Sequence, residues 1–362
     1  VAAGCYVQTK DTAGLDADID IVIGNNKKKE IARVLEDYFR ERDAGAKKIE
    51  RLDIGHTSEY EDLTVSHTAG HTRVFLKVQD GCNQFCSYCI IPYARGRVRS
   101  RSREEVVAEV RRLAERGYKE VVLTGIHLSS YGTDIGDDLL SLILSVHQVE
   151  GICRIRLGSL EPGIITEEFA RTLSECPKFC PHFHLSLQSG CDATLARMKR
   201  RYTTERYLES VELLRRHFDR PALTTDLIVG FPGETEGEFA QTLSFLQTCA
   251  FAQMHIFPYS RRQGTPAAGM PGQIPNGEKA RRAHQGAELA RAMEKSWLSS
   301  WMGQRVAVLF EEEKDGFWRG YTPQYIEVRG KGENLHNRVC PVTLTAVGEG
   351  VAFGVVTEEE AP

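Results

Sequence analysis

The chain has 362 residues, 41% of them hydrophobic, and a formal net charge of -4 at pH 7. It is long enough for two or three domains with a sizeable core, and its charge gives no overall sign of a nucleic-acid binder. No apolar run reaches the roughly 18 residues that span a bilayer and no signal peptide is visible, so we expect a cytoplasmic protein without a membrane segment. Ten cysteines in such a chain indicate metal binding or catalysis rather than a disulfide scaffold.

Residues 1–65 are predicted to form a small α/β domain. Residues 1–5 have the pattern of a buried strand followed by a turn, and no initiator Met precedes them, so we expect a fragment that lacks its N-terminal part. A short apolar strand is expected at 20–23 and a helix at 29–40. Residues 43–70 are polar and have little pattern, which indicates a linker.

Residues 70–300 are predicted to form the core domain, because strand and helix patterns alternate there. Strands are expected at 74–78, 120–123, 154–157, 182–187, 223–229 and 254–257. Helices are expected at 103–115, 139–146, 165–173, 204–217, 236–249 and 276–300. The alternation implies a parallel sheet with helices outside, and six units favour a partial (β/α)6 barrel. Its site should lie at the C-terminal ends of the strands.

Residues 303–358 change to short β runs separated by Gly-rich turns. The runs are at 306–310, 317–321, 325–328, 338–345 and 351–356. Five short strands predict a small β-barrel, a fold that often binds nucleic acid. The predicted fold class is therefore α/β, with a partial barrel between a truncated α/β domain and a small β-barrel.

Cys82, Cys86 and Cys89 form a C-x3-C-x2-C run directly after the first core strand. Structural zinc is one interpretation, but it needs four ligands, typically supplied as two pairs. Three thiolates can instead hold three irons of a [4Fe–4S] cluster and leave the fourth iron open. An open iron can take the amino and carboxyl groups of a small molecule, so the position of the run favours catalysis.

The cysteine run resembles the signature of radical S-adenosylmethionine (SAM) enzymes, and longer segments are similar to their methylthiotransferase family. Those segments include Gly81-Cys-Asn-Gln-Phe-Cys-Ser-Tyr-Cys89, Leu187-Gln-Ser-Gly-Cys191, Met198-Lys-Arg-Arg-Tyr-Thr203 and Asp226-Leu-Ile-Val-Gly-Phe-Pro-Gly-Glu234. The resemblance covers nearly the whole chain and implies that the end barrel is a TRAM-like, RNA-binding domain. Residues 125–132 and 255–266 are most similar to the branch that acts on N6-threonylcarbamoyladenosine at position 37, beside the anticodon.

The resemblance implies two SAM-dependent steps with the tRNA anticodon stem-loop as substrate. One SAM would methylate sulfur held at an auxiliary [4Fe–4S] cluster. A second SAM would give a 5′-deoxyadenosyl radical that takes hydrogen from C2 of the modified adenine, before sulfur couples to that carbon. We expect a monomer that receives electrons from a donor such as flavodoxin or ferredoxin. Methylthiolation of isopentenyladenosine or of a ribosomal protein, and a non-catalytic iron–sulfur RNA-binding role, are the alternatives.

Four predicted SAM contacts follow the second, third and fourth core strands. The resemblance places Gly125 near the SAM amino group, although an ordinary turn would also use this glycine. Glu161 could bond a ribose hydroxyl or substrate amine, or could simply be a charge near a helix N-terminus. Gln188 and Ser189 are neutral groups that suit a ribose or a carboxylate.

Three further SAM contacts are predicted, together with one ligand of the auxiliary cluster. Arg200 could hold the SAM carboxylate, while Ile228 and Phe231 could flank the adenine; a solvated basic face and core packing are the respective alternatives. Gly4-Cys5-Tyr6 resembles the last of three cysteines that hold the auxiliary cluster. Because the other two would lie upstream, the present chain should assemble one complete cluster.

Arginines alternate along the segment that follows the cysteine run: Arg95, Arg97, Arg99, Arg101 and Arg103. If this segment is extended, alternate side chains share one side and form a basic stripe for RNA phosphates. A solvated charged loop is the alternative interpretation.

Overall fold

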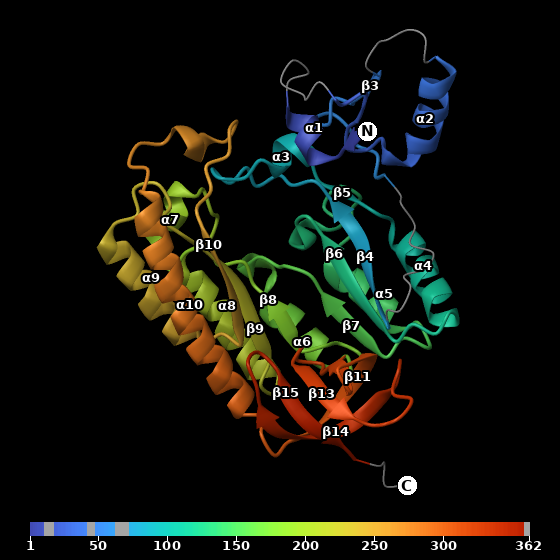
Figure 1. Ribbon diagram of the computed structural model, residues 1–362, viewed down its shortest axis with the longest axis vertical. Coiled ribbons are helices and arrows are strands. Elements are labelled where there is room, and N and C mark those ends of the chain that lie inside the picture. The colour runs from blue at the N-terminus through green and yellow to red at the C-terminus, as the bar shows by residue number, and fades with distance from the viewer. Residues whose placement is uncertain (11–17, 42–47, 62–71, 358–362) are drawn as a thin grey trace.

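The computed structural model describes residues 1–10, 18–41, 48–61 and 72–357. From top to bottom, Figure 1 shows a small α/β unit, a core of strands and helices, and a β-barrel that carries the C-terminus. These parts fall within the three predicted segments 1–65, 70–300 and 303–358, whose exact domain limits stay a prediction. None of the helices in the described ranges is both long and apolar enough to cross a membrane.

The first unit contains a parallel sheet in the order β1-β2-β3. Its strands are β1 (Ala2–Ala3), β2 (Ile21–Ile23) and β3 (Lys48–Glu50), and its helices are α1 (Cys5–Thr9), η2 (Lys28–Glu30) and α2 (Ile31–Arg40). Because β3 lies within 43–70, the prediction of a continuous linker is wrong for these three residues. Pairing with β2 defines this strand, whose single apolar residue, Ile49, gives no sequence pattern. Residues 43–47 and 62–70 of the predicted linker lie outside the described residues.

Six parallel strands form the core, and they follow one another in chain order. They are β4 (Arg73–Asp80), β6 (Glu120–Gly125), β7 (Arg154–Leu157), β8 (His182–His184), β9 (Ala222–Val229) and β10 (Gln253–Pro258). Ladders join β4, β6 and β7 into one sheet and β8, β9 and β10 into another, and isolated parallel bridges such as Leu160 to Leu185 connect the two. The predicted partial (β/α)6 barrel is therefore confirmed. A short antiparallel strand, β5 (Arg99–Ser100), adds an edge beside β4 that was not predicted.

Helices cover the outside of this curved sheet (Figure 1). They are α4 (Arg103–Glu115), α5 (Leu139–His147), α6 (Glu167–Ser174), α7 (Asp192–Arg197), α8 (Thr204–His217), α9 (Glu236–Cys249) and α10 (Asn276–Ser299), while the short α3 (Ile91–Arg95) lies against α1 of the first unit. Five of them begin after a side chain that accepts a hydrogen bond from the first helical turn: Ser102, Asp138, Thr166, Thr203 and Thr235. These N-caps satisfy amides that would otherwise lack partners, and so fix where the helices start.

The last unit is a closed barrel with the strand order β11-β12-β13-β15-β14. Its strands are β11 (Arg305–Lys314), β12 (Phe317–Tyr321), β13 (Glu327–Lys331), β14 (Val339–Val347) and β15 (Ala352–Val356). Val308, Phe310 and Val328 are fully buried inside it. The predicted five-stranded barrel is confirmed, and closure leaves none of these five strands with an open edge.

Buried charges tie this barrel to the amino ends of the core strands. Arg154 donates to the Tyr321 carbonyl at 2.7 Å, and Arg156 donates to the Pro323 carbonyl at 2.8 Å. Glu120 accepts from Arg156 at 2.8 Å, and its side chain is 1% exposed. Burial opposes ionisation of Glu120, but the charge and hydrogen bond of Arg156 prevail and lower its pKa.

Aromatic rings complete the same junction. Tyr321 and Tyr325 stack with their ring centres 4.9 Å apart, and His182 of β8 lies 5.0 Å from the Tyr325 ring. The Arg73 guanidinium lies 4.2 Å from the centre of Tyr321 and forms an ion pair with Glu311 at 3.0 Å. Cation–π contacts and ion pairs therefore fix the barrel against the core, so that the chain connection is not its only attachment.

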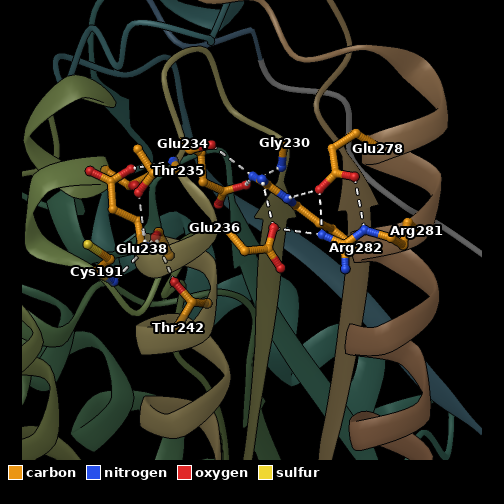
Figure 2. A network of polar contacts seen from close by, with 12 residues as sticks. Cys191, Gly230, Glu234, Thr235, Glu236, Glu238, Thr242, Glu278, Arg281 and Arg282 are labelled. Atoms are coloured by element: carbon orange, nitrogen blue, oxygen red, sulfur yellow. Dashed lines mark hydrogen bonds and ion pairs between the residues drawn. The ribbon is translucent and has the colours of Figure 1, made fainter.

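The turn after β9 is fastened at the opposite end of the core (Figure 2). Glu234, whose side chain is 1% exposed, accepts from the Gly230 amide at 2.6 Å and from Arg282 of α10 at 2.7 Å. Arg282 also pairs with Glu278 at 2.8 Å and with Glu236 at 3.3 Å. The turn that closes the end of β9 is thus held by both α9 and α10.

Candidate functional site

The three cysteines of the C-x3-C-x2-C run lie on the loop 81–90, which follows β4 and which we call the cysteine loop. Gly81 begins it with a φ of 73°, and a Cβ at this position would overlap the Arg97 carbonyl. The Cys82 amide donates to the Gly96 carbonyl at 3.0 Å, and the Ser87 amide donates to the Met198 carbonyl at 3.0 Å. Contacts with segments far along the chain therefore give the loop a fixed shape.

The three thiols are sheltered from solvent on this loop. Cys82 and Cys86 are buried and Cys89 is half-buried. Burial raises the pKa of Cys82 to about 11 and also raises the pKa of Cys89. The Cys82 and Cys89 thiols are therefore protonated at neutral pH, and bound metal supplies the charge that ionises coordinating cysteines.

A buried ion pair lies beside Cys86. Arg200 donates to the Cys86 sulfur at 3.3 Å and pairs with Glu161 at 2.8 Å. Glu161 also lies 3.1 Å from the His127 ring and accepts from Gln84 of the cysteine loop at 3.1 Å. Burial opposes ionisation of Glu161, but the hydrogen bond from His127 and the charge of Arg200 lower its pKa. The site therefore holds a carboxylate and a guanidinium next to the sulfur ligands.

A cavity of about 420 Å³ opens at the carboxyl ends of β9 and β10, next to the cysteine loop. Its lining includes Cys89 and Tyr88 from that loop, Gln188 from the end of β8, and Ile228 from β9. The volume is in the range of small-molecule sites, about 300–1,000 Å³. Gln188 has a φ of 68°, an uncommon conformation for a residue with a side chain that often marks functional sites.

Ser189, Phe231 and Gly125 do not line this cavity. The Ser189 hydroxyl lies 3.4 Å from the Thr242 hydroxyl of α9, and Phe231 is fully buried in a small cluster behind the site. Gly125 packs so closely on Gln79 that a Cβ would lie 2.8 Å from the Gln79 amide oxygen. Ser189 and Phe231 therefore lie behind the residues that line this cavity, and their contact with SAM stays a prediction.

The arginine run does not form one exposed stripe, so that prediction is wrong. Arg99 is 1% exposed and donates to the Arg95 carbonyl at 2.8 Å. Arg101 is 3% exposed and pairs with Glu109 at 2.7 Å. The segment passes from α3 through a turn into β5, so alternate residues do not share a face, and among the four predicted RNA contacts only Arg97 is exposed.

Cys5 lies next to α3, which directly follows the cysteine loop. Its sulfur accepts from Arg95 at 3.0 Å and from Asn25 at 3.4 Å. Asn25 also donates to the Ala94 carbonyl at 2.6 Å. The first unit therefore presents Cys5 toward the core on the side where the cysteine loop lies.

Two polar residues of the barrel interior were not singled out from the sequence. Asp226 lines the cavity, and its carboxylate lies 3.2 Å from His184. His184 is in turn 3.0 Å from the Thr224 hydroxyl. Asp226 and His184 lie on predicted core strands, and a strand places alternate side chains on its inner face. The sequence pattern does not show which alternate set faces inward, so these two residues were missed.

Comparison with known proteins agrees with this geometry. Residues 76–246 match the Radical SAM superfamily. The chain is 37% identical, over 98% of its length, to threonylcarbamoyladenosine tRNA methylthiotransferase MtaB of Bacillus subtilis, of which it covers 81%. It is 39% identical over 92% of its length to the Aquifex aeolicus protein of the same name, of which it covers 80%. It is also 39% identical over 85% of its length to tRNA-2-methylthio-N(6)-dimethylallyladenosine synthase of Moorella thermoacetica, of which it covers 70%.

The partial barrel and its cysteine loop define a radical SAM enzyme. With relatives of this similarity over most of both chains, the protein belongs to the radical SAM methylthiotransferase family. The cofactors of radical SAM enzymes are a [4Fe–4S] cluster and SAM, as the resemblance implied.

The donor set fits that cluster better than it fits a single ion. In the described part of the chain, no three His, Cys, Asp or Glu side chains lie close enough together to hold one metal ion. An iron–sulfur cluster has a different requirement, because each thiolate binds its own iron and the sulfurs stay apart. Three sheltered thiols beside a cavity of small-molecule size suit a cluster together with a bound nucleotide-like cofactor.

Proposed function

We propose that this protein adds a methylthio group to C2 of N6-threonylcarbamoyladenosine at position 37 of tRNA. The observation that carries the proposal is identity of 37% and 39%, over 98% and 92% of the chain, with two proteins named for threonylcarbamoyladenosine in tRNA. Isopentenyladenosine is the second candidate substrate, supported by the Moorella thermoacetica relative, which matches a smaller share of this chain. A ribosomal protein residue and a non-catalytic role are the remaining alternatives.

Cys82, Cys86 and Cys89 would hold the [4Fe–4S] cluster. When bound, the cluster supplies the electron that cleaves SAM reductively and so starts the radical chemistry. The walls of the cavity would exclude water from that chemistry, because Tyr88 of the cysteine loop and Ile228 of β9 are part of its lining.

The polar residues at the carboxyl ends of the strands would orient SAM and substrate. Arg200 and Glu161 supply opposite charges for the carboxylate and amine of the methionine part, while Gln188 supplies neutral bonding groups at the cavity wall. Gly125 keeps the second strand close to Gln79 and so shapes the loop that carries His127. Asp226, paired with His184, is the carboxylate that would meet the substrate inside the cavity.

The remaining parts of the proposal concern partners. The substrate is the anticodon stem-loop of tRNA, the electron donor is a flavodoxin or ferredoxin, and the enzyme works as a cytoplasmic monomer. Cys5, with its sulfur facing Arg95, would be one ligand of the auxiliary cluster that carries the transferable sulfur. The present chain would then hold about four irons, because it supplies the ligands of one complete cluster.

The test uses the anaerobically reconstituted protein, SAM, a reductant and separate transcripts that carry either threonylcarbamoyladenosine or isopentenyladenosine. With a form of the protein that also carries the auxiliary cluster, nucleoside mass spectrometry should detect the methylthio product on the RNA that contains threonylcarbamoyladenosine. Production of 5′-deoxyadenosine should require the cluster on the cysteine loop but not the auxiliary cluster.

The variant Cys86→Ala should lose 5′-deoxyadenosine formation, while Cys153→Ala, which removes an exposed cysteine outside the site, should retain it. If Cys86→Ala produced 5′-deoxyadenosine at the wild-type rate, the radical mechanism would be wrong. If the product formed only on the RNA that contains isopentenyladenosine, isopentenyladenosine would be the substrate instead of threonylcarbamoyladenosine.

A further inference from the structure

Five exposed cationic side chains gather at the carboxyl end of the core, and we call them the mouth cations. They are Arg97, Lys199, Arg201, Arg261 and Arg262. They come from three separate segments: the turn after α3, the segment after α7, and the loop after β10. Their positions in the sequence gave no sign that they belong together.

Each of the three segments is attached to the cysteine loop. The Gly96 carbonyl accepts from Cys82, the Met198 carbonyl accepts from Ser87 at 3.0 Å, and the Ala267 amide donates to the Ser87 carbonyl at 2.8 Å. The cysteine loop is therefore bonded to all three segments that carry the mouth cations.

Contacts place three of the mouth cations at the opening of the cavity, and the other two, Lys199 and Arg261, lie one or two residues from these in the chain. Arg97 lies 4.9 Å from the ring centre of Phe85, and Arg201 donates to the Asn83 carbonyl at 3.4 Å, both on the cysteine loop. Arg262 lines the cavity together with Cys89. The opening is thus bordered by positive charge from more than one direction.

None of the mouth cations has a carboxylate within ion-pair distance among the residues that the structure describes. Buried arginines of the same region are neutralised: Arg101 pairs with Glu109, and Arg200 pairs with Glu161. Unpaired like charges around one opening repel one another, to an extent that salt reduces over a Debye length of about 8 Å in physiological salt. A polyanionic ligand over the mouth would relieve that repulsion.

An exposed aromatic ring adds an independent indication of the ligand. Phe257 of β10 lines the cavity, and yet it is 51% exposed. Large exposed rings beside cationic grooves are typical of proteins that stack nucleic-acid bases. A base that enters the cavity could stack on Phe257 while its flanking phosphates remain outside.

We propose that the mouth cations bind the RNA backbone on both sides of the nucleotide whose base enters the cavity, and that Phe257 stacks on a base there. This inference rests on the proposed function, because it assumes that an RNA nucleotide is the substrate. RNA fits better than an acidic protein loop, since it carries one phosphate per nucleotide on either side of the target base. A protein loop brings carboxylates only where its sequence holds them.

The test measures binding of a fluorescent, threonylcarbamoyladenosine-containing anticodon stem-loop to the reconstituted full chain at several salt concentrations. One variant changes all five mouth cations to Gln. A matched variant changes five exposed cations on α4, α6 and α8, away from the cavity and the end barrel, to Gln: Arg111, Arg112, Arg171, Arg215 and Arg216. Circular dichroism and iron content establish that each variant is folded, and the single variants Arg201→Gln and Arg261→Gln are used if the fivefold variant is not.

The mouth variant should bind at least tenfold more weakly than the wild type. The slope of log K against log salt should fall by about 0.7–0.9 for each RNA phosphate that the variant no longer neutralises. The matched variant should stay within twofold of the wild type. Phe257→Ala should weaken binding about tenfold with no change of slope, because stacking carries no charge.

Unchanged affinity and slope in the mouth variant, or equal losses in the two fivefold variants, would overturn the inference. The inference would also be overturned if the mouth variant lost binding to an acidic ribosomal-protein peptide but still bound RNA like the wild type. The failure of the proposed function looks different: the wild type would bind the RNA through the mouth cations, but no methylthio product would form on it even with a form of the protein that carries both clusters.

Discussion

The two ends of the same six core strands use arginine in opposite ways. At the amino ends, Arg154 and Arg156 are buried and Arg73 is half-buried, and all three meet carboxylates or carbonyls of the core and end barrel. At the carboxyl ends, exposed cations without carboxylate partners among the described residues border a cavity. Charge that is neutralised inside the molecule holds domains together, whereas charge left unpaired at a cavity is available to a partner.

The same contrast occurs within the short arginine run after the cysteine loop. Arg99 and Arg101 are buried and bond to backbone or carboxylate groups of the core, while Arg97 reaches solvent beside Phe85. Residues of one type and one spacing therefore serve structure or recognition according to the partners that the fold brings to them.

Arg156→Ala should have the largest effect on stability, because it would break the amino-end junction. It leaves Glu120 buried without its main partner and removes bonds to the barrel carbonyls, so the free energy of unfolding should fall by about 3–5 kcal/mol. Denaturant unfolding measures this loss. Arg171→Ala, which breaks the exposed pair with Glu175, is the control and should cost less than about 1 kcal/mol. Equal losses in both variants would remove the distinction between the two kinds of charge.

Arg200→Lys should damage the carboxyl end with little effect on overall stability. An ammonium cannot reach both the Cys86 sulfur and Glu161 as the guanidinium fork does. SAM binding to the reconstituted protein, measured by calorimetry, should weaken about 10- to 100-fold. Arg206→Lys on α8 is the control, and it should bind SAM like the wild type. If Arg200→Lys bound SAM with the affinity of the wild type, Arg200 would not be a SAM-binding residue.

The variant Glu120→Gln should show how the contribution of the amino-end junction to the free energy of unfolding depends on pH. The pKa of Glu120 is lower in the folded protein than its ordinary value of 4.5, so its stabilising contribution is present above that value and is lost as the pH falls through the lowered pKa. Wild type should therefore be more stable than Glu120→Gln at pH 7, and the difference should shrink below about pH 4.5. Denaturant unfolding at both pH values tests this, and a constant difference would contradict it.

Thr235→Ala should have the smallest effect of the four substitutions. It removes the N-cap and capping box of α9, which starts beside the turn shown in Figure 2, and should cost about 1 kcal/mol of unfolding free energy. Thr248→Ala on the same helix is the matched control, because its exposed hydroxyl bonds only to the Ser244 carbonyl at 3.2 Å. If both substitutions had the same effect, capping would not explain where α9 begins.

The helices and most strands of the core could be predicted because their signals are local. The predicted ranges 103–115, 204–217 and 236–249 agree with α4, α8 and α9, each of which begins after a Ser or Thr that caps the first turn. β3 and β5 could not be predicted, because pairing with distant strands creates them. Among the site residues, the spacing of Cys82, Cys86 and Cys89 together with its position after the first core strand predicted the cluster.

The sequence by itself therefore determined the strand–helix alternation, the helix starts and the cysteine loop, since each depends on residues close together in the chain. Only the tertiary structure decided that Gln188 faces the cavity while Ser189 faces α9, and that Arg97 is exposed while Arg101 is buried. The physical reason is that the environment of a polar side chain is set by whichever groups the fold brings beside it, and these groups lie far away in the sequence.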